Sequence, residues 1–152
     1  MLVARVGGLA CAFPIEHVVE TMRPLAVEPI GRSGDEALAL VDGLAMIRGA
    51  AVPVVDVRRL LGVTGAPATR FVVVRIADRR IALVVDAVIE VRHLELHAFD
   101  RLPPLLGGAS RDCVSAIGAR EADLLVVLDA ARVLPEDSWR ALDQRADRAE
   151  RP

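Results

Sequence analysis

The sequence contains no lysine, no asparagine and no tyrosine, and its single tryptophan is Trp139. Aromatic residues make up only 3% of its 152 positions. Proteins that bind single-stranded nucleic acid stack bases on aromatic side chains and present a basic face. This chain has few aromatic side chains and a formal net charge of −2. The composition therefore argues against nucleic acid as a partner.

Cysteine is also scarce, because Cys11 and Cys113 are the only two and they lie far apart in the sequence. Both have apolar neighbours and neither lies in a redox or metal-binding motif, which predicts buried, reduced thiols. The N-terminus lacks the charged-then-apolar order of a secretory signal. Charged residues interrupt every apolar stretch before it reaches the length of a membrane span. We therefore expect a cytoplasmic protein that does not insert directly into a membrane.

Motifs of catalysis and of cofactor binding are missing too. There is no GxGxxG and no phosphate-binding loop in the sequence, and these are the usual signals of nucleotide binding. The serines do not stand in a nucleophile elbow, and the cysteines have no papain-like context. The residues thus indicate no catalytic group and no cofactor.

What the chain does have is a series of aliphatic strands. Apolar residues make up 53% of the sequence, enough for the core of one domain or of two very small subdomains that share it. Short alternating runs predict more strands than helices. A helical turn near Pro14 is expected to lead into a strand that ends near Glu20. Three hairpins are predicted, which pair residues 2–6 with 9–13, 71–76 with 81–85, and 114–117 with 124–128.

The segment 43–62 predicts several elements in a short span. The apolar run before Arg48-Gly49 and the run around Pro53 indicate two strands with a chain reversal between them. Proline cannot donate to a ladder, so we expect Pro53 at the start or edge of its strand. Asp56 is well placed to cap a short helix, which Gly62 would end.

The sequence contains an internal echo. The residues 52–62, VPVVDVRRLLG, recur in outline at 125–135 as LVVLDAARVLP. In each copy a strand, a capping Asp, a short helix and a breaker follow one another. A third copy of the strand and its Asp, at 83–88, lacks the helix. Repeated units of this kind with few long helices suggest small barrels, in which closure removes exposed edges.

Three aspartates, Asp56, Asp86 and Asp129, each end an apolar strand. One interpretation is a carboxylate cluster that holds a divalent cation. The other is two helix caps and one turn anchor, which capping favours because it also explains the residues that follow Asp56 and Asp129. His93 and His97 have a metal-compatible spacing for a helix, and with the two cysteines they would complete a zinc site. Their segment alternates as a strand does, so surface histidines are the favoured interpretation.

Two further groups of residues have both a functional and an ordinary interpretation. Glu20 and Arg48 can meet as an ion pair that orients one surface, or remain two solvated charges worth about 0–1 kcal/mol. Val88 and Val91, with Val18, form either an exposed aliphatic groove of the kind that marks a partner surface or part of the core. The sequence leaves both questions open.

Four segments in this order resemble the CheW-like domain, the adaptor of bacterial chemotaxis arrays. They are FPIEHVVETMR, GLAMIRGAAVPVVDVRRLLG, RIALVVDAVIEVRHL and LLVVLDAARVL. The second segment is the most specific, because it is similar to the family signature Gly-x-x-Asn-Leu-Arg-Gly-x-x-x-Pro-x-x-Asp-Leu-Arg. Met46 and Ile47 stand where that signature has Asn and Leu.

The resemblance implies a mostly β fold of two small five-stranded Src-homology-like barrels with a shared core, short helices and a C-terminal helical tail. It places a CheW-like domain at residues 1–135 and a charged tail at 136–152. Trp139 and Leu142 in the tail have the spacing of a helix that packs back on the body. The resemblance implies no catalysis and no metal.

The resemblance also implies partners. Such a protein would be an adaptor that couples the cytoplasmic tip of chemoreceptors to the regulatory domain of a CheA-type histidine kinase. A receptor hairpin would lay its apolar face in a groove. The groove residues implied by motif match are Val18, Glu20, Arg48, Gly49, Val88 and Val91. The alternatives are a divergent paralogue that serves a kinase array controlling pili or a second messenger, or a small metal-binding protein built on the three aspartates.

Overall fold

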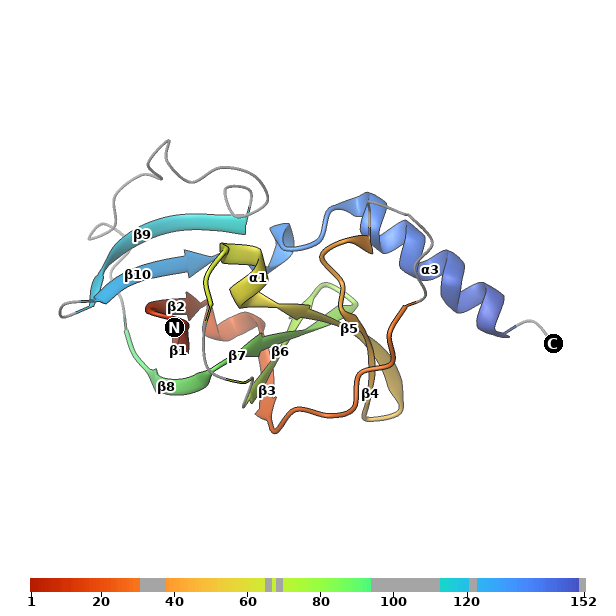
Figure 1. Ribbon diagram of the computed structural model, residues 1–152, viewed down its shortest axis with the longest axis horizontal. Helices are drawn as coiled ribbons and strands as arrows, with labels where there is room; N and C mark the ends of the chain where they lie inside the picture. Colours follow the sequence, from red (N-terminus) through yellow and green to blue (C-terminus); the bar gives the residue numbers. More distant parts are fainter. Residues whose placement is uncertain (31–37, 65–66, 68–69, 94–112, 121–122, 151–152) are drawn as a thin grey trace.

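The computed structural model describes residues 1–30, 38–64, 67, 70–93, 113–120 and 123–150. Figure 1 shows the arrangement of strands and short helices. The elements are β1 (Leu2–Val6), β2 (Leu9–Phe13), η1 (Ile15–His17), β3 (Val18–Met22), β4 (Gly43–Ile47), β5 (Ala50–Asp56), α1 (Val57–Leu61), β6 (Arg70–Ile76), β7 (Arg79–Val85), β8 (Ala87–Val91), β9 (Val114–Arg120), β10 (Asp123–Leu128), η4 (Ala130–Arg132) and α3 (Glu136–Glu150).

The strands form two five-stranded sheets. The first has the order β8-β1-β2-β10-β9 and the second the order β3-β6-β7-β5-β4. Neighbouring strands are antiparallel except for the pairs β2–β10 and β5–β7, which are parallel. The chain passes from the second sheet to the first at Asp86, between β7 and β8. The expected mostly β fold with two five-stranded units is confirmed, whereas closure of either sheet into a barrel remains a prediction.

The three predicted hairpins are present, and the local signals explain them. The first reverses at Gly7, which has a φ of +59°, a conformation that glycine adopts without steric cost. The turn between β6 and β7 is shorter than predicted, because β6 extends to Ile76 and β7 begins at Arg79. Ala77 in that turn has a φ of +55°.

The expectation for Pro53 was wrong. This proline lies in the middle of β5, which has β7 on one side and β4 on the other. Its partner on β4 is Leu44, whose backbone groups bond to Glu28 on the opposite side. The pairing of β5 with β7 begins only at Val54. Pro53 therefore needs no N–H at this position, which is how an interior strand accommodates it.

Most of the core is a single apolar cluster that draws residues from both sheets. It includes Val6 and Phe13 of the first sheet and Val72 and Leu83 of the second. Two smaller clusters lie on other faces, one around Phe71 in the second sheet and one around Leu125 in the first. Because the large cluster is shared, the two sheets stabilise each other through burial of the same apolar surface.

The C-terminal helix α3 packs back on the body as expected. Leu142 is buried in the shared core cluster, and Trp139 packs against it. Arg79 lies over the Trp139 ring, with its Cζ 4.9 Å from the ring centroid. The same guanidinium donates two hydrogen bonds to the Glu136 carboxylate, at 2.9 and 3.1 Å. The helix thus docks through one apolar face and one bidentate ion pair.

Candidate partner-binding site

The turn between β4 and β5 presents Arg48 to solvent. Both turn residues have positive φ, +50° for Arg48 and +80° for Gly49. Two consecutive positive φ values are typical of the type I′ turn, whose twist matches that of the flanking strands. The Arg48 side chain is 71% exposed, and its Nε donates to Glu20 Oε2 at 2.7 Å. The predicted ion pair is therefore present.

Glu20 lies on β3, at the other edge of the same sheet. The ladder between β3 and β6 contains a bulge, because Val18 pairs with Val74 and Glu20 with Val73. The extra residue, Val19, is 40% exposed. A bulge locally re-aims side chains. The ion pair consequently spans the interval between the two edge strands of the second sheet.

A backbone contact links the same two edges. Glu28, in the segment after β3, exchanges two hydrogen bonds with Leu44 on β4, at 2.8 and 2.9 Å. Gly43 permits this approach, because a Cβ at that position would overlap the Glu28 carbonyl oxygen. Backbone pairing thus holds β4 against the segment that follows β3, in addition to the ion pair between Glu20 and Arg48.

The three predicted groove valines differ in their environments. Val18 and Val88 are half-buried and pack against the shared core cluster. Val91 is 66% exposed at the end of β8, opposite Leu2. Val88 also lines a surface pocket with Arg23 and Arg70. The structure brings Glu20 and Arg48 together, whereas a common groove for the three valines remains a prediction.

The three strand-ending aspartates have structural partners. Asp56 accepts from the backbone N–H of Arg58 at 3.0 Å and so caps α1. Asp129 caps η4 by accepting from Ala131 at 3.0 Å. Asp86 accepts from the backbone N–H of Gly7 at 3.0 Å. Each contact matches the capping and turn-anchoring interpretation of these residues.

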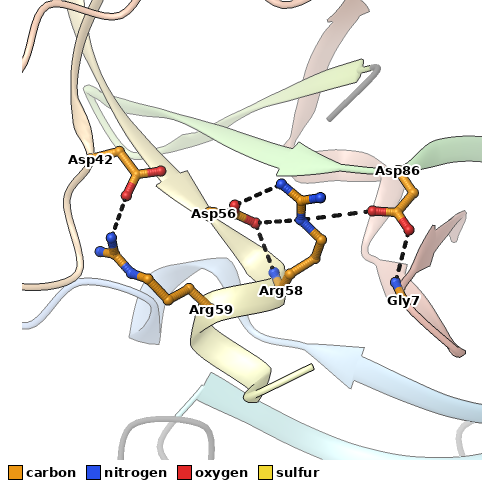
Figure 2. Close-up of polar contacts among 6 residues, drawn as sticks. All are labelled: Gly7, Asp42, Asp56, Arg58, Arg59 and Asp86. Carbon is orange, nitrogen blue, oxygen red and sulfur yellow. Dashed lines mark hydrogen bonds and ion pairs between the residues drawn. The ribbon is translucent and has the colours of Figure 1, made fainter. Parts of the chain in front are cut away.

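Arg58 joins two of these aspartates, as Figure 2 shows. Its guanidinium donates to both carboxylate oxygens of Asp56, at 3.1 and 2.9 Å, and its Nε lies 3.8 Å from Asp86 Oδ1. These bonds to Asp56 raise the pKa of Arg58 above its usual value. Beside this network, Arg59 pairs with Asp42 at 2.7 Å. Burial raises the pKa of Asp42, and the opposing effect of Arg59 is smaller.

The other metal-binding hypothesis used cysteines and histidines. Cys11 and Cys113 are both buried free thiols. Burial, with a smaller contribution from Cys113, raises the pKa of Cys11 to about 12. His93 is exposed beyond β8, and His97 lies outside the described residues. Within the described part of the chain, no three His, Cys, Asp or Glu side chains are grouped closely enough to hold a metal ion.

Comparison with known proteins shows to which family this chain belongs. The sequence profile of the CheW-like domain matches residues 1–138. The chain belongs to the CheW-like family. Protein FrzA from Myxococcus xanthus is 30% identical over 146 residues, which cover 91% of this chain and 86% of that protein. Domains of the CheW-like family are non-enzymatic scaffolds and adaptors, which agrees with the lack of a catalytic motif in the sequence.

A solved structure supports the fold. The scaffolding protein TtCheW from Thermoanaerobacter tengcongensis superimposes with a TM-score of 0.69 and 21% sequence identity, over 84% of this chain and 86% of that chain. At this identity the likeness establishes the fold alone. Among the described residues of this CheW-like protein, no helix is both long and apolar enough to span a membrane.

Local sequence signals found some of the residues at this site and missed others. The Arg-Gly turn and the position of Glu20 at the end of an apolar run led to the ion pair. Arg58 could have been found, because an arginine two residues after a capping Asp can reach back to it. Arg23 and Arg70, which line the pocket beside Val88, gave no signal, because their proximity depends on the non-local pairing of β3 with β6.

Proposed function

We propose that this CheW-like protein is a cytoplasmic adaptor that couples the cytoplasmic tip of a chemoreceptor to the regulatory domain of a CheA-type histidine kinase. The observation that supports this role most directly is the ion pair between Arg48 and Glu20. It spans the two edges of the second sheet, and the Arg48 side chain is 71% exposed. An exposed side chain that is oriented by an ion pair within its own protein is available to contact a binding partner.

The proposed mechanism is geometric. A receptor hairpin would lay its apolar face against the half-buried Val18 and Val88 and the exposed Val91, in a helix-in-groove mode. The Glu20–Arg48 pair would fix the orientation of the hairpin, and Gly49 would leave its approach free of a side chain. A scaffold of this kind transmits a signal when its two partners shift each other's conformational equilibria through a shared complex.

The specific array served is a separate matter. Met46, which stands where the family signature has Asn, is 63% exposed. It adds apolar surface two residues from Arg48, and this supports the second candidate, a paralogue with its own receptor in an array that controls pili or a second messenger. Binding to receptor tips from each array of the same genome would distinguish the two candidates.

The test is calorimetric binding of the purified protein to the receptor tip and, separately, to the kinase regulatory domain. In Arg48→Asn, the new side chain tolerates positive φ, so the turn is kept and the cation is lost. We expect a loss of about tenfold or more in receptor affinity, the equivalent of one charge-assisted hydrogen bond, with kinase affinity unchanged. Arg59→Gln, which removes a different exposed ion pair, is the matched control and should leave both affinities unchanged.

Two results would contradict the proposal. If the unmodified protein binds neither partner, the adaptor role is wrong. If Arg48→Asn lowers the free energy of unfolding by several kcal/mol, the arginine is structural and the orientation argument is wrong. The variant Glu20→Gln tests the role of the carboxylate. Because Glu20 is proposed only to orient Arg48, this variant should lose less receptor affinity than Arg48→Asn does.

A further inference from the structure

A second polar feature lies near Val88, away from the Glu20–Arg48 pair. A surface pocket of about 640 Å³ is lined by Arg23, Pro24, Arg70, Ala87 and Val88. Both arginines are exposed. The pocket lining comes from both sheets, because Arg70 begins β6 of the second sheet and Ala87 begins β8 of the first. The pocket therefore lies where the end of β3 and the start of β6 approach the first sheet.

The two arginines lie just beyond the end of the β3–β6 ladder and line the same pocket. The last pair of that ladder is Met22 with Phe71, and Arg23 follows Met22 while Arg70 precedes Phe71. Like charges directly opposite on a sheet repel each other and reduce its stability. Within the described residues neither arginine forms an ion pair. In the described part of the chain, by contrast, several other arginines have a carboxylate within 3.9 Å, among them Arg48, Arg58, Arg59, Arg79, Arg92, Arg132 and Arg140.

We propose that Arg23 and Arg70 together bind a carboxylate on the receptor helix, an Asp or Glu that borders its apolar face. This inference rests on the proposed receptor function and names the chemistry that the receptor must supply. Two guanidinium groups can share one carboxylate with charge-assisted hydrogen bonds, which are about twice as strong as neutral ones. The incoming charge would also relieve the repulsion between the two arginines.

The surroundings favour a helix over other anionic partners. Pro24, Ala87 and Val88 supply apolar surface beside the cations, which suits a helix whose acidic residue borders an apolar face. Val88 belongs both to this pocket and to the predicted groove, so one helix would contact both. Base stacking would need aromatic side chains, and the described residues that line the pocket include none.

The test uses the receptor-tip hairpin in calorimetry at low and high salt. The double variant Arg23→Gln and Arg70→Gln should lower receptor affinity about tenfold or more. It should also flatten the salt dependence of binding, because screening acts on the lost charges. Arg75→Gln is the matched control, since Arg75 is an exposed arginine of β6 whose Nε donates to the nearby Ala77 carbonyl at 2.8 Å. It should bind like the unmodified protein.

A second arm identifies the receptor group. Each acidic residue of the receptor tip is changed in turn to its amide. One of these changed tips should bind the unmodified protein weakly. The same tip should bind the double variant with no further loss of affinity. The midpoint of urea unfolding should stay the same or rise in the double variant, because a like-charge pair is removed.

Each other outcome overturns the inference in a recognisable way. If the receptor tip binds the unmodified protein and the double variant equally, the arginine pair has no such role, while the adaptor role stands. If the unmodified protein does not bind the receptor tip, both fail. If the double variant unfolds at clearly lower urea, the arginines are structural. If it loses binding only to single-stranded DNA or anionic vesicles, the anion is not a receptor carboxylate.

Discussion

Arg48 occupies a backbone conformation that an arginine seldom adopts. Its φ of +50° lies in the left-handed region, which costs a residue with a Cβ about 1–2 kcal/mol. Asparagine or glycine would fit this turn position with less strain. The arginine is kept there with its guanidinium exposed and paired to Glu20. Strain of this kind tends to accumulate where function requires a particular side chain, which is consistent with the recognition role proposed for Arg48.

Glu136 provides a prediction on pH at the scale of single residues. Its hydrogen bonds with Arg79 lower the pKa of this carboxyl below 4.5. Because the pKa is lower in the folded state, the contribution of the pair is present above about pH 4.5 and is lost as the pH falls further. Trp139 is the only tryptophan and contacts Arg79. We expect its fluorescence to shift to the red on acidification as α3 loosens.

Two variants isolate this effect. In Glu136→Gln the red shift should already be present in part at neutral pH, and its dependence on pH below about 5 should be weaker. Asp137→Asn is the control, because Asp137 is 83% exposed and lies 3.9 Å from Arg140. If both variants follow the unmodified protein, the ion pair does not hold the helix against the body.

At the scale of elements, the β4–β5 hairpin contains two glycines that differ in the space around them. A Cβ on Gly43 would overlap the Glu28 carbonyl oxygen, whereas a Cβ on Gly49 would meet no atom within 4 Å. Gly43→Ala should therefore lower the free energy of unfolding by about 2–3 kcal/mol, as overpacking against a fixed backbone does. Gly49→Ala should cost only about 1 kcal/mol, from its positive φ. Urea unfolding of the two variants measures the difference, and equal losses would show that the Glu28–Leu44 contact is not rigid.

The elements also show how far sequence reasoning reaches. The hairpins, the Asp56 cap and the Arg-Gly turn were predicted because each depends on neighbouring residues. The bulge at Val19 and the interior position of Pro53 were not, because each depends on which strand lies alongside. The parallel pairs β2–β10 and β5–β7 join segments far apart in the chain, and no local pattern specifies them.

The candidate site divides in the same way. The ion pair between Glu20 and Arg48 was predicted as one of two outcomes, and the structure confirmed the contact. The proximity of Arg23 and Arg70, which line one pocket, was not predicted, because it follows from the register of β3 on β6. A register of this kind is set by burial of one face of a whole sheet.

At the scale of the whole molecule, the two sheets share one arrangement. The second sheet has the order β3-β6-β7-β5-β4. If five is added to each strand number, and β1 is counted as the strand after β10, this order becomes β8-β1-β2-β10-β9, which is the order of the first sheet. Both β3 and β8 pair through a bulge, within the similar triplets 18–20 (VVE) and 88–90 (VIE). Asp56 and Asp129 cap the corresponding short helices. The internal echo in the sequence thus reflects two copies of one architecture.

Two such copies need a connection, and Asp86 supplies one beyond the shared core. It lies between β7 and β8, accepts from Gly7 in the first sheet, and faces Arg58 on α1 beside the second. Its side chain is only 9% exposed. Because its loss would leave the partly buried Gly7 N–H without its acceptor and Arg58 with one carboxylate fewer, Asp86→Ala should lower the free energy of unfolding by about 2–3 kcal/mol.

The matched control for Asp86 is Asp42, whose partner Arg59 is also on α1 but is 51% exposed. Asp42→Ala should cost only about 0–1 kcal/mol, as exposed pairs do.

Both variants should still unfold in urea in one transition, by fluorescence and circular dichroism alike. The reason is that the largest core cluster draws on both sheets, so neither sheet can lose it alone. Two separate transitions in Asp86→Ala would mean that the carboxylate, and not the shared core, makes the sheets a single cooperative unit. Equal losses in the two variants would mean instead that the contacts of Asp86 contribute no more than a surface pair.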